Sequence, residues 1–111
     1  MEHSIRVSAE LILSKLVEKF RLNHSEMLKD SRFAKYETHY ALIFNTRKFN
    51  ITTTIKLNLD FSLIGVYTWI PEESKSRIND PLDARDRLNT RFLGYLEAIV
   101  MPGLKTAGVA A

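Results

Sequence analysis

The sequence predicts an α+β fold, a three-stranded antiparallel meander covered on one face by an N-terminal helix and a C-terminal helix. Between Ile51 and Phe61, apolar residues alternate with Thr, Lys, Asn and Asp. Strict alternation sends successive side chains to opposite faces of an extended chain, so this stretch is the central strand. Residues 8–22 and 81–101 instead place apolar residues at helical spacing.

The length and composition predict one soluble domain over residues 1–111, with residues 102–111 as a flexible or docked tail. The longest apolar runs have about four residues, far below the ~18 that a membrane span needs, so no membrane partner is expected. The N-terminus lacks the apolar core of a signal peptide, which predicts a cytoplasmic protein. There is no cysteine to form disulfides or zinc sites of the cysteine type.

The first helix is predicted to begin after Ser8, a plausible N-cap, and to run to about Leu22. Asn23 followed by Glu26 resembles a capping box, which predicts either a short second helix or a kinked continuation of the first. In both cases Met27 and Leu28 would point inward. Residues 30–37 are charged and weakly patterned, and we interpret them as the end of that helix and a loop.

Two further strands are predicted to flank the central one. The first runs from about His39 to Asn45, and residues 47–50 are short enough for a hairpin turn. Residues 60–62 make the next break, and the third strand covers residues 63–70 before Pro71 ends it. Consecutive strands joined by tight turns form an antiparallel meander.

The last helix has the clearest boundaries, after a charged and flexible connection over residues 72–79. Asp80 is placed as the N-cap and Pro81 as the first helical residue, and Pro102 with Gly103 is expected to end the helix. Acidic residues in the first turn suit the helix dipole. The apolar stripe that should face the core is Ala84, Leu88, Phe92, Leu96 and Ile99.

The outer strands carry apolar residues on both faces, although the central strand has one polar face. If the helices cover one face of the sheet, the other shows a Thr/Lys/Asn stripe between aliphatic and aromatic side chains. Either another segment of the chain covers this face, or it binds a second copy or another protein. The predicted interface residues are Ile43, Lys56, Tyr67 and Trp69, together with the last-helix arginines Arg85, Arg87 and Arg91.

Residues suited to catalysis or to binding cofactors are scattered. His3, His24 and His39 lie too far apart for a local metal motif, and the aspartates near Asp80 are explained as helix caps and dipole charges. The four glycines stand alone, so no phosphate-binding loop is present. The sequence therefore predicts no catalytic residues, no metal and no cofactor.

Positive charge is concentrated in the first half of the chain. Residues 1–56 hold ten Lys/Arg against six Asp/Glu, whereas residues 57–111 hold six against seven. Basic residues contact phosphates and interleaved aromatics stack on bases, so nucleic-acid binding is the alternative hypothesis. Its candidate residues are Lys15, Lys19, Arg21, Arg47 and Lys48.

The leading hypothesis is a non-catalytic protein-interaction module, an accessory component, modulator or inhibitor of a larger assembly. It would bind another protein, or a second copy of itself, through the outer face of the sheet.

Overall fold

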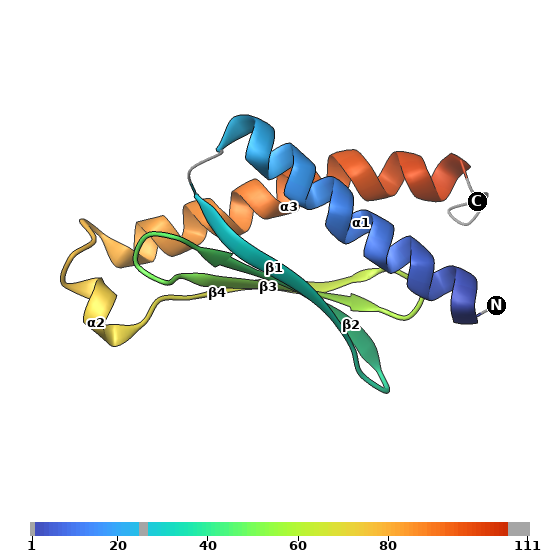
Figure 1. The fold of residues 1–111 in the computed structure, drawn as a ribbon, viewed down its shortest axis with the longest axis horizontal. Helices are drawn as coiled ribbons and strands as arrows, with labels where there is room; N and C mark the ends of the chain where they lie inside the picture. The colour runs from blue at the N-terminus through green and yellow to red at the C-terminus, as the bar shows by residue number, and fades with distance from the viewer. Residues whose placement is uncertain (1, 25–26, 107–111) are drawn as a thin grey trace.

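The computed structural model describes residues 2–24 and 27–106 (Figure 1). It confirms an α+β fold with an antiparallel sheet and helices at both ends, but the sheet has four strands, not three. The elements are α1 (Glu2–Asn23), β1 (Leu28–Lys35), β2 (His39–Thr46), β3 (Thr52–Asn58), β4 (Leu63–Trp69), α2 (Glu72–Lys75) and α3 (Pro81–Thr106).

The additional strand, β1, lies where the sequence predicted a second helix and a loop, and that prediction is wrong. β1 pairs antiparallel with β2, with Phe33 opposite Leu42 and a register shift just after Leu28. As an edge strand it needs few apolar residues, and its charged side chains hide the alternation that identifies a strand. Asn23, the predicted cap of that helix, is the last residue of α1, and Glu26 lies outside the described residues.

Helix α1 begins at Glu2, six residues before the predicted N-cap. Ser8 therefore lies in the helix interior, where a serine destabilises the helix by roughly 0.5 kcal/mol relative to alanine and does not end it. The end of the helix agrees with the prediction to within a residue. Leu16 and Phe20 are fully buried, as their helical spacing indicates.

The sheet has the order β1-β2-β3-β4, and every neighbouring pair is antiparallel. Strands β2, β3 and β4 confirm the three predicted strands to within one or two residues at most of their ends. Leu42 lies opposite Ile55, which lies opposite Val66, and these three define the inner face toward the helices. Helix α1 packs over the β1 side of that face and α3 over the β4 side.

The β2–β3 turn adopts an unusual backbone conformation, with φ of 69° at Phe49 and 52° at Asn50. A bulky residue rarely adopts positive φ, so the surrounding contacts must hold it there. The Thr46 hydroxyl donates to the Lys48 carbonyl at 2.7 Å and accepts the Ile51 N–H at 3.0 Å. The Ser74 hydroxyl donates to the Phe49 carbonyl at 2.6 Å, which ties this turn to α2.

The connection after β4 is more structured than predicted. Residues 72–75 form the short helix α2, and Ser74 within it is buried. The Ser74–Phe49 hydrogen bond explains the difference, because it anchors the middle of a charged segment to the β2–β3 turn.

The start of α3 confirms the predicted cap, because the Asp80 carboxylate accepts the Asp83 N–H at 3.1 Å. The predicted end is wrong, since α3 continues through Pro102 and Gly103 to Thr106. A proline removes one backbone donor but leaves the hydrogen bonds on both sides, so a helix can run through it at a cost. The rest of the predicted tail, residues 107–111, lies outside the described part of the chain.

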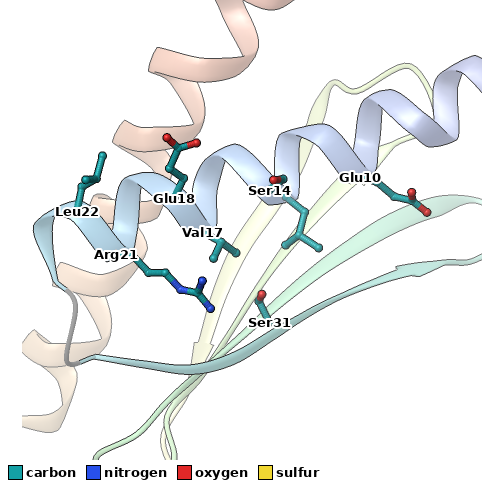
Figure 2. A pocket seen from close by; sticks show the side chains of 8 residues that line it. Glu10, Ser14, Val17, Glu18, Arg21, Leu22 and Ser31 are labelled. Atoms are coloured by element: carbon teal, nitrogen blue, oxygen red, sulfur yellow. The ribbon is translucent and has the colours of Figure 1, made fainter.

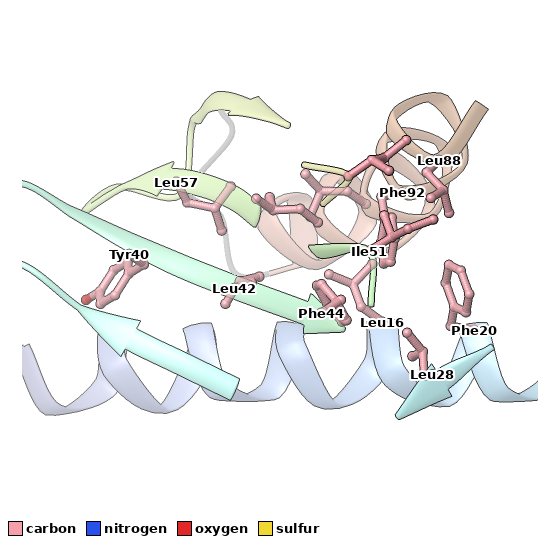
Figure 3. Close-up of a cluster of buried hydrophobic side chains, with 13 residues drawn as sticks. Leu16, Phe20, Leu28, Tyr40, Leu42, Phe44, Ile51, Leu57, Leu88 and Phe92 are labelled. Atoms are coloured by element: carbon pink, nitrogen blue, oxygen red, sulfur yellow. The ribbon is translucent and has the colours of Figure 1, made fainter. Parts of the chain in front are cut away.

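The core lies between the two helices and the inner face of the sheet (Figure 3). Phe92 of α3 packs against Phe20 of α1 and Phe44 of β2, with ring centroids 4.6 Å apart in both pairs. Aromatic pairs at this distance add to the free energy gained by burial. This cluster joins three elements at one point. Over the described residues, no helix is both long and apolar enough to cross a membrane.

Candidate functional site

The outer face of the sheet is the strongest candidate for a functional surface. Both long helices lie on the inner face, and within residues 2–24 and 27–106 no helix or strand covers the opposite face (Figure 1). We call this surface the outer face. Strand register places on it Asp30, Arg32, Ala34, Ala41, Ile43, Asn45, Thr52, Thr54, Lys56, Gly65, Tyr67 and Trp69.

Two aromatic side chains dominate the outer face at its β4 side. Trp69 is 63% exposed and Tyr67 is 53% exposed. The Tyr67 ring lies along its own strand over Gly65, so close that a β-carbon at Gly65 would meet the phenol oxygen at 2.5 Å. The absence of a side chain at Gly65 therefore gives the ring its place. The Lys56 ammonium lies 5.4 Å from the centre of the same ring, within cation–π range.

Ile43 has a different role from the aromatic residues. It faces outward but is only 8% exposed. Its register neighbours are Arg32 on β1 and Thr54 on β3, and Tyr67 follows Thr54 in the same row. Ile43 thus belongs to the floor of the outer face, where it supports the neighbouring side chains, while the aromatics present most of the exposed apolar area.

A chain of polar side chains crosses three strands of the outer face. The Asn45 amide donates to the Asp30 carboxylate at 2.5 Å, and the Thr52 hydroxyl donates to the Asn45 oxygen at 2.8 Å. Trp69 is the next residue in this row, opposite Thr52. Sequence reasoning missed Asp30 and Arg32 because it assigned them to a helix or loop. The only sequence signal for a strand here was the two-residue spacing of Asp30, Arg32 and Ala34, which places all three on one face, and this signal is weak.

The predicted arginines of the last helix do not join this surface. Arg85, Arg87 and Arg91 lie on α3, in the helix layer on the other side of the sheet. Arg87 pairs with Asp83 at 2.7 Å, as their spacing of four residues indicates, and Arg85 pairs with Asp86 at 3.3 Å. Arg91 contacts the Met27 sulfur at 3.8 Å. The structure therefore divides the predicted interface residues into two separate groups.

The basic residues of the alternative hypothesis are also divided. Lys15, Lys19 and Arg21 lie on α1, whereas Arg47 and Lys48 lie in the β2–β3 turn. The Lys19 ammonium lies 5.9 Å from the Tyr95 ring, and Lys48 lies 5.3 Å from the Phe49 ring. On the outer face, Lys56 lies beside the exposed Tyr67 ring, whereas Arg32 lies on β1, with β2 and β3 between it and the aromatic residues of β4.

A groove of about 500 Å³ runs between α1 and β1 (Figure 2). Its lining includes two carboxylates, Glu10 and Glu18, with Arg21 and Ser31. Eight residues on a helix span about 12 Å, so the two carboxylates lie too far apart to act on one atom. In the view of Figure 2 they point away from each other. Among the described residues, no group of three His, Asp or Glu side chains could hold a metal ion.

One histidine is placed in a specific environment between the two long helices. The His24 ring nitrogen lies 3.0 Å from the Tyr95 hydroxyl. Burial, and secondarily the positive charge of Arg91, hold the pKa of His24 below its ordinary value. This favours the neutral imidazole, which suits a structural contact between α1 and α3.

Comparison with known protein families, with curated proteins and with solved structures finds no match to this chain.

Proposed function

We propose that this protein is a non-catalytic binding module that docks another protein on the outer face of its sheet, as an accessory component or modulator of a larger assembly. The observation that carries the proposal is the pair Tyr67 and Trp69, both more than half exposed on a face without a covering element in the described chain. Tyrosine and tryptophan are enriched among the residues that dominate protein interfaces.

The surroundings of the two rings support the same function. Ile43 and Ala41 form a buried apolar floor on β2, one strand beyond β3 on the same face, and the polar chain from Asp30 ends at Thr52, opposite Trp69. An apolar centre with a polar rim is the usual arrangement of a protein interface. Tyr67 is also held in place over Gly65 and beside Lys56, so it loses less conformational freedom on binding than a mobile side chain does.

The experiment compares affinity capture by the wild-type chain with capture by Trp69→Ala, Tyr67→Ala and the control Leu22→Ala. Leu22 is 79% exposed on α1, away from the outer face, so it controls for the loss of any exposed apolar side chain. A true partner is retained by the control and weakened about tenfold or more by each aromatic variant. If every captured protein responds equally to all three variants, the proposal is wrong.

Binding of single-stranded nucleic acid is a second candidate function, and one arrangement favours it. Arg32 and Lys56 lie on the outer face with Tyr67 and Trp69, and proteins that bind single strands combine cations with aromatic platforms for stacking. Asp30 is the only acidic residue among the strand positions that the register places on the outer face, and Asn45 already donates to its carboxylate.

The single tryptophan separates the two functions directly. A base stacked on Trp69 would quench its fluorescence as an oligonucleotide is added at low salt, and added salt would reverse the effect. Arg32→Gln with Lys56→Gln would weaken this binding, whereas Lys15→Gln with Lys19→Gln on α1 would not. Unchanged Trp69 emission at saturating oligonucleotide would exclude nucleic-acid binding on this face.

A further inference from the structure

Three exposed cations lie where the β2–β3 turn meets α2, and we call them the basic cluster: Arg47, Lys48 and Arg77. The Lys48 ammonium lies 5.3 Å from the centre of the Phe49 ring, and the Arg77 guanidinium carbon lies 5.5 Å from the same centre. Both distances are within cation–π range. Among the described residues, no carboxylate forms an ion pair with any of the three cations.

Hydrogen bonds hold the two sides of the basic cluster together, although Ser74 and Phe49 are 25 residues apart in the sequence. The Ser74 hydroxyl donates to the Phe49 carbonyl at 2.6 Å, and the Arg77 N–H donates to the Ser74 carbonyl at 3.0 Å. Like charges repel each other, so placing Lys48 and Arg77 on one ring without a carboxylate has an electrostatic cost. An anion that binds between them removes this cost.

The basic cluster borders the outer face at the end where Trp69 lies. Thr52 is opposite both Asn45 and Trp69, and this row is the last one in β2 and β3 before the turn that joins them. From Trp69 the chain runs through Ile70 and Pro71 into α2, so α2 and the β2–β3 turn lie at the same end of the sheet (Figure 1). A partner that covers the Trp69 ring therefore lies next to the basic cluster.

Positive charge dominates the surface formed by the outer face and the basic cluster. Strand register places Arg32 and Lys56 on the outer face, and Asp30 is its only acidic strand position. On α2, the Glu72 carboxylate already pairs with the Lys75 ammonium at 2.8 Å. Interfaces place potentials of opposite sign against each other, so a partner that complements this surface carries carboxylates.

We propose that the protein docked on the outer face presents an acidic segment, whose carboxylates contact Lys48 and Arg77 while an apolar residue beside them packs on Trp69. The inference rests on the proposed function, because it names the chemistry of the partner for the same surface. The two cations are at most about 11 Å apart, and carboxylates two or three residues apart on an extended chain are separated by about 7–10 Å. One short acidic stretch can therefore contact both cations.

The arrangement of charges favours an acidic protein over a nucleic acid. Single-stranded nucleic acids bind along a continuous positive groove that follows their backbone. Here the basic cluster is confined to one end of the sheet, and the neighbouring elements β1 and α2 carry Asp30, Glu72 and Glu73. A continuous row of phosphates would meet these carboxylates, whereas a few carboxylates among apolar residues would not need to.

The first experiment selects binders for the full chain from a phage-displayed library of random peptides at low ionic strength. The selected peptides should be enriched in Asp and Glu beside aromatic or aliphatic residues. Selection on the double variant Lys48→Gln with Arg77→Gln should lose the acidic enrichment and keep the apolar one, and Trp69→Ala should do the opposite. The matched control Lys15→Gln with Arg21→Gln removes two exposed cations from α1 and should select the same peptides as the wild type.

The second experiment measures the affinity of the best selected peptide by fluorescence anisotropy. Lys48→Gln with Arg77→Gln should weaken binding about five- to tenfold, the effect of losing two exposed charge pairs. Replacing the acidic residues of the peptide with their amides should weaken binding to the wild type by the same factor. The amide peptide should bind the wild type and the double variant equally, because the same contacts are removed from either side.

The outcomes separate this inference from the proposed function. Peptides that depend on Trp69 but show no acidic enrichment would overturn the inference and leave the proposed function in place. A selection in which no peptide depends on Tyr67 or Trp69 would overturn both. Single-stranded oligothymidylate is the third probe: tighter binding than that of the best peptide, lost in Lys48→Gln with Arg77→Gln, would identify the basic cluster as a nucleic-acid site and overturn the acidic protein partner.

Discussion

Each face of the sheet carries a chain of three hydrogen-bonded polar side chains, and the two chains lie in opposite environments. On the inner face, the Thr68 hydroxyl donates to the Asn89 oxygen at 2.6 Å and lies 2.8 Å from the Thr53 hydroxyl. Because the single Thr68 proton is used, Thr53 is the donor to Thr68. On the outer face, Asp30, Asn45 and Thr52 are linked in the same manner but lie next to water.

Burial decides how much such a chain of polar side chains contributes to stability. A buried polar group without a partner costs the full free energy of its desolvation, whereas an exposed one exchanges its partner for water. The inner chain therefore fixes the position of α3 on β4, and among the described residues no buried side-chain polar atom lacks a partner. The outer chain can change with little effect on the fold.

The largest expected difference in stability between substitutions on the two faces comes from their aromatic residues. Phe92→Ala should lower the free energy of unfolding by about 3–5 kcal/mol, because the ring is buried and packs against Phe20 and Phe44. Trp69→Ala should lower it by less than about 0.5 kcal/mol, because its ring is largely in water. Urea denaturation measures both, and a comparable loss in the two variants would show that the outer face is covered.

Substitutions in the two polar chains should differ by a smaller amount in the free energy of unfolding that they remove. Asn89→Ala removes the acceptor that the buried Thr53–Thr68 hydroxyl pair needs for its second proton and should cost about 1–3 kcal/mol. Asn45→Ala removes the matching residue of the outer chain and should cost less than about 1 kcal/mol, since water replaces the amide. Equal losses in urea denaturation would contradict the role assigned to burial.

On the helix side, His24 should make stability depend on pH. Its pKa is lower in the folded protein than the ordinary 6.5, chiefly through burial. The unfolded chain therefore takes up a proton first as the pH falls, so the free energy of unfolding decreases from about pH 6.5 down to the folded pKa. His24→Gln should flatten the profile over this range. An unchanged profile in His24→Gln would contradict the assignment.

The smallest expected effect belongs to the contact between Lys56 and Tyr67 on the outer face. An exposed cation–π pair contributes about 0.5–1 kcal/mol at most. A double-mutant cycle with Lys56→Gln and Tyr67→Leu isolates this energy from the other effects of each substitution. A coupling energy indistinguishable from zero would mean that Lys56 does not hold the ring.

The elements that sequence reasoning predicted well are those whose pattern matches their burial. In β3, Thr53, Ile55 and Leu57 are buried and alternate with more exposed residues, so the sequence displays the two faces directly. In α3, Asp80 and Pro81 mark the start, and Leu88, Phe92 and Leu96 are buried as their spacing indicates. Local chemistry determines both features.

The parts that were missed depend on partners distant in sequence. In β1, the inward positions include Ser31 and Lys35, so only pairing with β2 determines that the segment is a strand. The same applies to Ser74, whose position depends on a carbonyl 25 residues earlier. Of the predicted interface residues, Ile43, Lys56, Tyr67 and Trp69 share the outer face because register aligns them, while the α3 arginines were grouped with them without any geometric link.

The strand order has a consequence for how the chain folds. Each strand pairs only with its neighbour in sequence, so the sheet can form one short hairpin at a time. The contact between α1 and α3 is different, because His24 and Tyr95 are 71 residues apart and closing that loop costs more chain entropy.

We therefore expect helix docking to follow the transition state for folding. Phe20→Ala should mainly accelerate unfolding, and a substitution within the β2–β3 hairpin, such as Thr46→Val, should mainly slow folding. Stopped-flow kinetics would contradict this order if Phe20→Ala reduced the folding rate by its full equilibrium effect. In the expected order of events, the antiparallel sheet forms early during folding. The two helices pack onto the sheet late and detach from it first during unfolding.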